Sequence, residues 1–371
     1  MRDLPAEEFP LTGDRILVTG GAGFIGSRLV RQLRASAEKT VVFDSLHPQV
    51  HGEGATFPDE GANVICMKAD IRDGDALRSA ISDHTPTLVY HLAAETGTGQ
   101  SYDLISRYCD VNVGGTARLI EALRQSRSPP RRVVLASSRA VYGEGAFQAD
   151  DGSLIIPASR REEQLKAGDF VPRDLAGRAL RPVPTPESLP PAPASIYGST
   201  KLMQEYLLEQ GLAGMATELV LLRFQNVYGP GQSLRNPYTG VLSIFCSQIL
   251  AGRTLNIFED GEIVRDFVFV DDVVEALVKA GAAAAPGSTP INIGSGTPAS
   301  ILGTAQFLLK ILGAPEDRFL ISGDFRIGDI RHSVADIARA CERLNWQPRF
   351  SLKKGLEALA DWARQEASSS R

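Results

Sequence analysis

A glycine-rich turn between a strand and a helix constrains this chain more than any other feature. The run RILVTG (15–20) is apolar and β-branched, and FIGSRLVRQLRAS (24–36) continues from it with a helical pattern. Gly20, Gly23 and Gly26 occupy the junction at the spacing GxxGxxG. Such glycines permit a tight turn, a close approach of a dinucleotide backbone and close helix–strand packing. We therefore expect a dinucleotide-binding unit whose helix N-terminus faces a pyrophosphate.

Apolar strands and amphipathic helices alternate through the first 224 residues. Five more nearly continuous apolar runs follow the first, as expected for strands that are covered on both faces. They are TVVFD (40–44), NVICMKAD (63–70), TLVYHLAA (87–94), RRVVLASS (131–138) and ELVLLRF (218–224). This alternation predicts an α/β fold with a doubly wound parallel (Rossmann) sheet and right-handed crossovers.

The alternation breaks between about residues 144 and 194, a segment rich in proline, glycine and charge that we call the arm. Structureless segments of this length are either functional or disordered. The arm is therefore either a surface excursion or a lid or subunit-contacting element beside the active site. We expect a cofactor-binding Rossmann domain over 1–228, which includes the arm. Residues 229–371 should form mostly a smaller substrate-binding region, with some segments returning to the Rossmann domain.

Composition and charge exclude several classes of function. The 39 basic and 44 acidic residues argue against a nucleic-acid partner and against a polybasic membrane patch. The polar first 14 residues lack the apolar core of a signal peptide, and no apolar run is long enough to span a bilayer. The four cysteines are far apart, which favours reduced thiols in a cytoplasmic protein, and no His/Cys cluster indicates a metal.

An aspartate at the end of the second predicted strand indicates which dinucleotide binds. Asp44 closes the run TVVFD. A carboxylate there can accept both ribose hydroxyls and repels a 2′-phosphate. The sequence therefore favours NAD over NADP.

The run SIYGSTK places Tyr197 four residues before Lys201, on one face of a predicted helix. A phenol titrates near ~10, and lowering that pKa to ~7 requires about 4 kcal/mol. The ammonium of Lys201 and an oxidised nicotinamide would both favour the phenolate. Tyr197 could then take a proton from a substrate hydroxyl whose carbon gives a hydride to the cofactor. Ser137 and Ser138 end the fifth strand, at the sheet edge where ligands bind.

These motifs together resemble the extended short-chain dehydrogenase/reductase superfamily, in its nucleotide-sugar epimerase/dehydratase branch. The matching features are GxxGxxG, Asp70-Ile71, HLAAETG, NVGGT and YxxxK, and they cover nearly the whole chain. The resemblance implies that Ser138, Tyr197 and Lys201 are catalytic, with Lys201 also holding the nicotinamide ribose. It implies cofactor contacts from Gly20, Gly23, Phe24, Ile25, Gly26, Asp44, Asp70, Ile71, Leu92, Ala93, Ala94, Asn112, Tyr197, Lys201 and Gln225.

The substrate side is assigned by the same resemblance. The motif LRFQNVYGPGQ places Asn226 at the diphosphate-sugar, and LNIF places Asn256 near the base. Arginine forks suit a diphosphate. The full set of expected substrate residues is Thr96, Ser138, Arg139, Asn226, Asn256, Arg265, Arg326, Asp329 and Arg331.

The residues after Ser138 separate two reaction types. The 4,6-dehydratases of this family carry an Asp-Glu pair there, which expels water across C5 and C6. This chain has Arg139 and Ala140 instead. Dehydration is therefore not expected, whereas epimerisation at C4 needs only the tyrosine, the serine and NAD.

The motifs ETGTGQS and QNVYGPGQSLRNPYTGVLSIF, together with the arm, resemble more narrowly the dTDP-L-rhamnose 4-epimerases. Relatives of this kind carry arm cysteines that suggest a metal, and this arm has neither Cys nor His. The expected protein is a homodimeric nucleotide-sugar 4-epimerase with NAD. Three alternatives remain: a 4-ketoreductase, which would usually prefer NADPH; a UDP-hexose 4-epimerase; and a non-catalytic NAD-sensing protein, which would generally lack the active Tyr or Lys.

Overall fold

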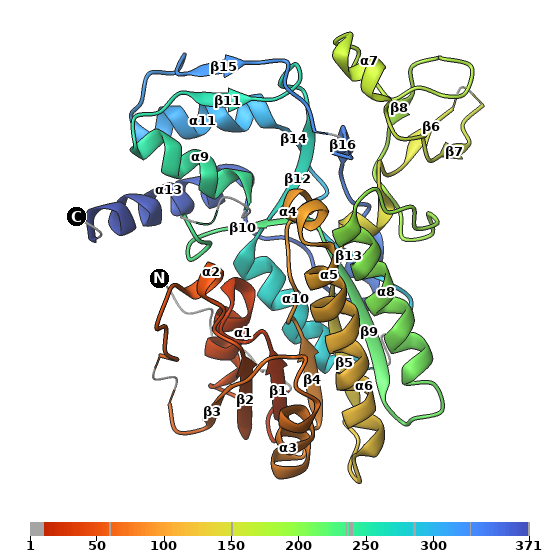
Figure 1. The fold of residues 1–371 in the computed structure, drawn as a ribbon, viewed down its shortest axis with the longest axis vertical. Helices are drawn as coiled ribbons and strands as arrows, with labels where there is room; N and C mark the ends of the chain where they lie inside the picture. The colour runs from red at the N-terminus through yellow and green to blue at the C-terminus, as the bar shows by residue number, and fades with distance from the viewer. Residues whose placement is uncertain are drawn as a thin grey trace.

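The structure is a computed structural model that describes residues 11–58, 61–149, 151–234, 236, 240–284, 287–326 and 328–369. Its centre is a seven-stranded sheet in the order β3-β2-β1-β4-β5-β9-β13, and all its neighbouring pairs are parallel (Figure 1). The strands are β1 (Arg15–Thr19), β2 (Lys39–Asp44), β3 (Val64–Lys68), β4 (Leu88–His91), β5 (Arg132–Ser138), β9 (Glu218–Phe224) and β13 (Ile291–Ile293). The doubly wound Rossmann sheet is therefore confirmed, and all six predicted strands are present. The first ten residues, on which part of the signal-peptide argument depends, lie outside the described residues.

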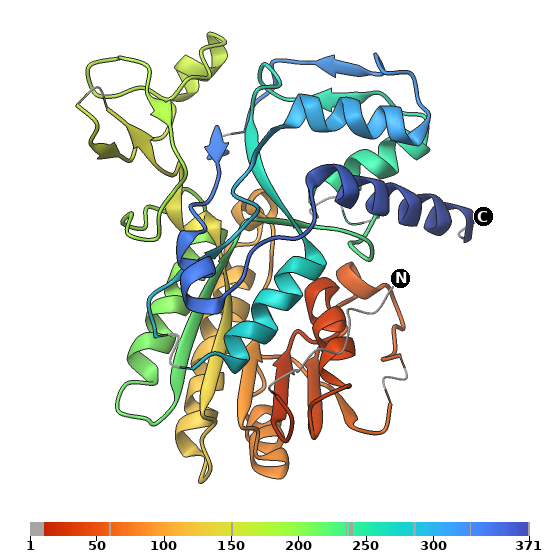
Figure 2. The ribbon, with the colours of Figure 1, turned by 180° about the vertical axis from the view of Figure 1, so that it is seen from behind.

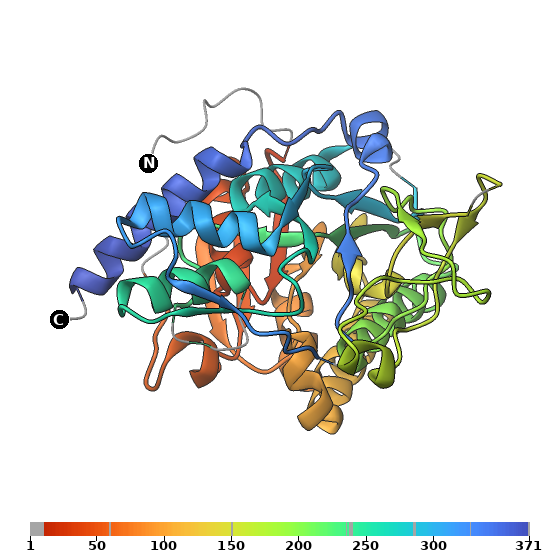
Figure 3. The same cartoon turned by 90° about the horizontal axis from the view of Figure 1, so that it is seen from above.

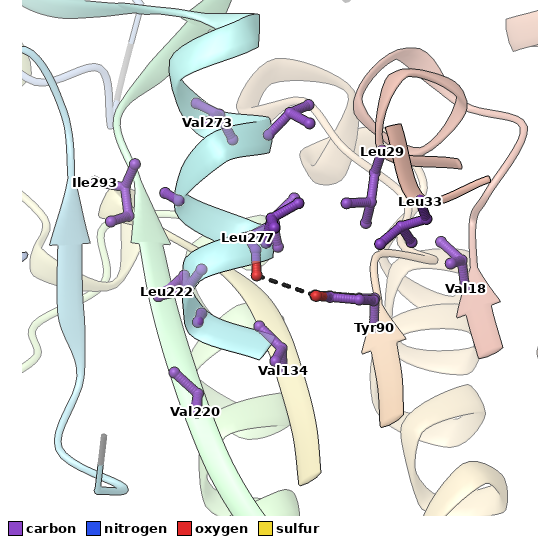
Figure 4. Close-up of a cluster of buried hydrophobic side chains, with 14 of the residues drawn as sticks. Val18, Leu29, Leu33, Tyr90, Val134, Val220, Leu222, Val273, Leu277 and Ile293 are labelled. Carbon is purple, nitrogen blue, oxygen red and sulfur yellow. Dashed lines mark hydrogen bonds between the residues drawn. The ribbon is translucent and has the colours of Figure 1, made fainter. Parts of the chain in front are cut away.

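Helices cover both faces of this sheet, which explains why its strands are apolar throughout. One face packs against α1 (Phe24–Leu33), α10 (Val270–Ala282) and α12 (Ala338–Leu344). Figure 2 shows α10 lying across this face, and Figure 4 shows its side chains meeting those of the strands. The other face packs against α3 (Gly74–His84), α6 (Gly115–Gln125) and α8 (Ile196–Gly211).

Two buried contacts tie later segments of the chain into this sheet. Strand β13 pairs with β9, with Ile293 opposite Phe224. The hydroxyl of the fully buried Tyr90 donates a hydrogen bond of 3.2 Å to the Leu277 carbonyl of α10 (Figure 4). Segments beyond residue 228 thus complete the Rossmann layer, while the domain boundary at 228 itself stays a prediction.

The remaining C-terminal elements form a second core above the sheet. Strand β12 (Val264–Phe269) pairs with β10 (Asn226–Tyr228), β14 (Pro298–Ser300) and β16 (His332–Ser333), and β11 (Leu255–Ile257) pairs with β15 (Phe319–Ile321). Helices α9 (Val241–Leu250), α11 (Ile301–Leu312) and α13 (Leu352–Ser369) pack around these strands. No helix in the described part of the chain is long and apolar enough to cross a membrane.

The arm has secondary structure of its own. It contains a three-stranded antiparallel sheet of β6 (Phe147–Gln148), β7 (Leu154–Ile155) and β8 (Arg181–Pro182), and a short helix α7 (Glu162–Lys166). Figure 3 shows the arm on the side of the molecule away from α9, α11 and α13. The strands are only two residues long, so they gave no periodic pattern in the sequence.

A buried cluster of charges fastens the arm to the C-terminal region. Arg160 of the arm lies 2.8 Å from a Glu259 carboxylate oxygen and 3.3 Å from one of Glu144. Its guanidinium also donates to the Asp329 carbonyl, at 2.9 Å. Arg331 pairs with the other Glu259 oxygen at 2.9 Å. This cluster joins the arm to residues 259–331, and we call it the arm clamp.

Candidate active site

A cleft of about 750 Å³ opens at the carboxyl ends of the sheet strands. The strand order reverses between β1 and β4, and ligands of such sheets bind at this switch point. Segments after β1, β2, β3, β4 and β5 line the cleft, together with the start of α8, residues 224–227 and 231–233, Asn236 and Gly240. No described residue of the arm lines it, so its predicted role as a lid gains no support from the geometry.

The glycines after β1 let the turn pack tightly against neighbouring backbone. Gly20 has φ +70°, and a Cβ there would lie 2.7 Å from the Ala93 amide nitrogen. A Cβ on Gly26 would lie 2.2 Å from the Gly20 carbonyl oxygen. Helix α1 begins after Gly23, and no side chain of the described residues caps its amides. The turn thus brings a helix N-terminus to the cleft with free N–H groups, which suits a pyrophosphate.

The predicted ribose and adenine residues lie together at one end of this cleft. Asp44 accepts backbone N–H groups from Ala22 at 3.0 Å and Leu46 at 2.9 Å, which fixes its carboxylate at the rim. His51 approaches it at 3.7 Å. Asp70 pairs with Arg72, whose hydrogen bond holds the pKa of that carboxyl below its usual range. The cleft lining includes Phe24, Ile25, Ile71, Leu92, Ala93, Ala94 and Thr96.

Asn112 lies behind the cleft and is not among its lining residues. The side chain is fully buried in a π-helical segment, η1 (Cys109–Gly114). Its amide accepts from the Glu95 N–H at 2.8 Å and donates to the Glu95 carbonyl and to Thr200 Oγ1. These contacts join the loop after β4 to helix α8, and the cofactor contact expected of Asn112 stays a prediction.

Tyr197 and Ser138, the two predicted catalytic residues with hydroxyl groups, both line the cleft. Ser195 caps helix α8 by accepting the Gly198 N–H, so Tyr197 lies in the first turn. Its ring meets that of Tyr108 edge-on, at 6.4 Å between centroids. Burial raises the pKa of Tyr197, while a hydrogen bond with Ser138 and the charge of Arg139 lower it. In the protein alone the phenol is therefore favoured, and ionisation requires positive charge nearby.

Lys201 lies one turn further along α8, also at the cleft, and is buried. Its ammonium donates to Gln204 Oε1 at 2.6 Å. Burial lowers the pKa of Lys201 to about 7, although Glu205 opposes this shift. Lys201 thus carries less positive charge near neutral pH than the sequence argument supposed. Gln204, three residues away on the same helix, was missed by that argument, although the spacing could have revealed it.

A second missed group anchors α8 to the sheet. Glu205 pairs with Arg223 of β9 through two bonds of 2.9 and 2.6 Å, and both are buried. Ser137 also donates its hydroxyl to Glu205. Ser137 therefore belongs to this anchor. Residues distant in the sequence meet here, so no local motif indicated it.

The far wall of the cleft carries two predicted residues. Gln225 accepts a hydrogen bond of 3.0 Å from Ser333 and lines the cleft. The side-chain oxygen of Asn226 is buried and has no hydrogen-bond partner among the described residues. A buried polar atom without a partner is costly, so this oxygen is suited to receive a hydrogen bond from a ligand hydroxyl.

The remaining predicted substrate residues do not line the cleft as the structure describes it. Arg265 pairs with Asp329 at 2.7 Å, and Arg331 is held by Glu259 and Asp260. Asn256 donates to Asp324, and the Arg326 guanidinium lies 4.9 Å from the centre of the Phe258 ring. Their substrate contacts stay predictions. Arg331 would have to break its ion pairs with two carboxylates before it could contact a substrate.

Together the glycine turn, the uncapped helix, Asp44 and the apolar loop after β4 fit NAD. Within the described residues no cluster of His, Cys, Asp and Glu could hold a metal ion.

Known proteins match nearly the full length of this chain. Residues 16–294 match the NAD dependent epimerase/dehydratase family. The dTDP-L-rhamnose 4-epimerase of Burkholderia thailandensis is 41% identical and covers 95% of this chain and 96% of its own. The UDP-glucose 4-epimerase of Mycolicibacterium smegmatis is 34% identical, covering 95% and 99%.

Solved structures have the same fold. MoeE5 in complex with UDP-glucuronic acid and NAD has a TM-score of 0.75, 31% identity and coverage of 95% and 100%. The dTDP-glucose 4,6-dehydratase DesIV from Streptomyces venezuelae, with NAD and TYD bound, has a TM-score of 0.75 and 25% identity over 96% and 98%. The resemblance seen in the sequence is thus confirmed, and the chain belongs to the NAD dependent epimerase/dehydratase family.

Proposed function

We propose that this enzyme interconverts the C4 epimers of a nucleotide-activated 6-deoxyhexose, with dTDP-L-rhamnose and dTDP-6-deoxy-L-talose as the favoured pair. One observation carries the reaction type: Ser138 and Tyr197 share the cleft, and Arg139 and Ala140 follow Ser138 where dehydratases have two carboxylates. The fold itself does not decide, because a dehydratase has the same one. The name of the 41% identical relative supports the substrate.

The side chains of the cleft divide the work. Tyr197 removes the proton from the C4 hydroxyl, and Ser138 holds the same oxygen through its hydroxyl. NAD, which the glycine turn, Asp44 and Lys201 would hold, would supply the acceptor for the C4 hydride and the donor for its return. The side-chain oxygen of Asn226 accepts a hydrogen bond from a hydroxyl of the sugar-diphosphate. The 4-keto sugar must turn between the two transfers, so that C4 presents its other face.

A reaction in deuterated water, without added cofactor, tests this proposal. The hydrogen at C4 stays in the closed site, so the product should contain no solvent deuterium at C4 or C5, and no NADH should be consumed. Denatured protein should release NAD. Mass spectrometry and NMR of the product locate any deuterium. The absorbance of the reaction mixture and of the denatured sample reports NADH consumption and released NAD.

The alternatives give different results in the same experiment. Deuterium at C5 indicates a dehydratase, and NADPH oxidation that matches product formation indicates a 4-ketoreductase. Interconversion of UDP-hexoses alone would keep the mechanism and discard the dTDP-sugar. No turnover with any nucleotide sugar, in protein that retains NAD, would favour an NAD-sensing protein.

We further propose a homodimer through the helices that carry Asn112 and Tyr197. Four large apolar side chains near them are exposed, namely Tyr102 (43%), Ile105 (49%), Met203 (44%) and Tyr206 (44%). Light scattering should give twice the mass of one chain, and Met203→Glu should shift it towards one chain. A wild-type mass of one chain at micromolar concentration would contradict the dimer.

A further inference from the structure

Arg139 is a cation at the reactive end of the cleft, and it has no hydrogen-bonded partner among the described residues. It begins the short 3₁₀ helix η2 (Arg139–Tyr142), directly after Ser138, and it lines the cleft together with Ser138 and Tyr197. Among the residues that the structure describes, none accepts a hydrogen bond from its guanidinium or forms an ion pair with it. Burial lowers the pKa of Arg139 to about 10, so it remains charged at neutral pH.

The nearby carboxylates are already engaged by other arginines. Asp329 binds Arg265 at 2.7 Å, and Glu144 binds Arg160 at 3.3 Å. Both acids influence Arg139 only through space. The positive charge of Arg139 therefore remains available to a group that becomes negative in the cleft.

Close backbone packing joins the segment that carries Arg139 to the segment that carries Tyr197. A Cβ on Gly198 would lie 2.5 Å from the Ala140 carbonyl oxygen, so η2 and the first turn of α8 touch at these two residues. Ala140 directly follows Arg139, and Gly198 directly follows Tyr197. The glycine thereby brings the guanidinium and the phenol close enough for each to affect the ionisation of the other.

We propose that Arg139 supplies the fixed positive charge that stabilises the Tyr197 phenolate, and so acts as a positioning residue for proton removal. Lys201 lies on the same helix, but it is buried and donates to Gln204. Two further groups face Tyr197 without a charge at neutral pH, the Ser138 hydroxyl and the Tyr108 ring. Arg265 faces Arg139 as a like charge, and its ion pair with Asp329 offsets that charge. The proposal rests on the proposed function, because it assigns Tyr197 as the base.

Two variants isolate the charge. Arg139→Met keeps much of the side-chain volume and removes the charge, while Arg139→Lys retains it. Arg118→Met is the control, because Arg118 is an exposed arginine of α6 that is not among the residues lining the cleft. The protein has eight tyrosines, so ultraviolet difference titration is read against Tyr197→Phe, which isolates the ionisation of Tyr197.

The expected result is a change in ionisation and in the pH profile. Tyr197 must start as the phenolate, so turnover is present above its pKa and is lost as pH falls through it. An opposite charge nearby lowers a pKa by about one to three units. Arg139→Met should raise the Tyr197 midpoint and the acid limb of kcat by that amount, which is about tenfold in kcat per unit below the limb. Arg139→Lys should restore most of this shift, and Arg118→Met should cause none.

Two outcomes would overturn the inference. One is an unchanged Tyr197 midpoint in folded Arg139→Met. The other is a raised KM with an unchanged kcat profile, which would make Arg139 a diphosphate ligand. The titration does not depend on turnover. A wild-type protein that titrates as expected but converts no nucleotide sugar would therefore refute the proposed function alone.

Discussion

Replacing Tyr197 by phenylalanine should lower kcat by about 10²–10⁴-fold, the usual contribution of a general base. The variant loses the hydroxyl that hydrogen-bonds Ser138 and retains the ring that packs edge-on against Tyr108. Bound NAD and the KM for the nucleotide sugar should change little, because the lost group acts on the proton and not on binding. Steady-state kinetics at several pH values, with NAD content measured on the same sample, checks this result.

The matched control lies on the same helix. Tyr206 is nine residues further along α8 and 44% exposed, so Tyr206→Phe removes the same atom away from the cleft. Its kcat should stay near that of the wild type. If Tyr197→Phe retains wild-type turnover, the base must be sought elsewhere, and the assignments of Tyr197 and of Arg139 both fail.

The parts of the fold that could be predicted are those in which a local pattern dictates the structure. A strand buried on both faces must be apolar throughout, so the runs ending at Thr19, Asp44 and Ser138 were visible in the sequence. The glycine turn was visible because no other residue fits beside the backbone at Gly20 and Gly26. These two signals also placed the cleft, since the edge of a parallel sheet follows from its strands.

The ionisation state of the site could not be read from spacing. Tyr197 and Lys201 share a helical face as predicted, but the consequence drawn from this depended on Lys201 being charged. Burial of its side chain, which lowers its pKa to about 7, comes from segments distant in the sequence. Arg139 follows Ser138, and the sequence argument used it only to show that the carboxylate of the dehydratases is missing at this position. Its relation to Tyr197 became visible only through the packing at Gly198.

The arm escaped prediction for a related reason. Its strands are too short to show a period, and its stability depends on charges that are distant in sequence. Arg160 is separated in the sequence by 16 residues from Glu144 and by 99 residues from Glu259. In a sequence, such residues are indistinguishable from the charges of a solvated surface, which is why a surface excursion remained open.

The arm clamp yields the largest expected effect on stability. Arg160→Met should lower the free energy of unfolding, or of local arm opening, by about 3–5 kcal/mol, the range found when one partner of a buried ion pair is removed. Arg160, Glu144 and Glu259 are 8%, 5% and 1% exposed, so water cannot replace the lost partner. Calorimetry gives the total loss, and hydrogen exchange of residues 161–181 shows whether the arm opens before the rest.

A matched variant separates this effect from the loss of an arginine as such. Arg173→Met removes an exposed arm arginine that pairs with Asp169, and it should leave the melting temperature near that of the wild type. Arg160→Lys retains the charge but not the fork that reaches four partners, so an intermediate loss is expected. The KM should also rise in Arg160→Met if Arg265 binds substrate, because Arg160 supports Asp329, the partner of Arg265.

The pH dependence identifies the cause of this loss. Burial already raises the pKa of Glu144, and Arg160 opposes the rise. Without Arg160 the folded-state pKa rises further above the unfolded value, so the folded protein binds the proton more tightly than the unfolded chain does. Such a group favours folding at low pH and loses that contribution as pH rises through the folded-state pKa. The deficit of Arg160→Met against the wild type should therefore be largest near neutral pH and should shrink towards pH ~5. A deficit that is equal at both pH values would mean that lost packing, and not the lost charge beside Glu144, destabilises the variant.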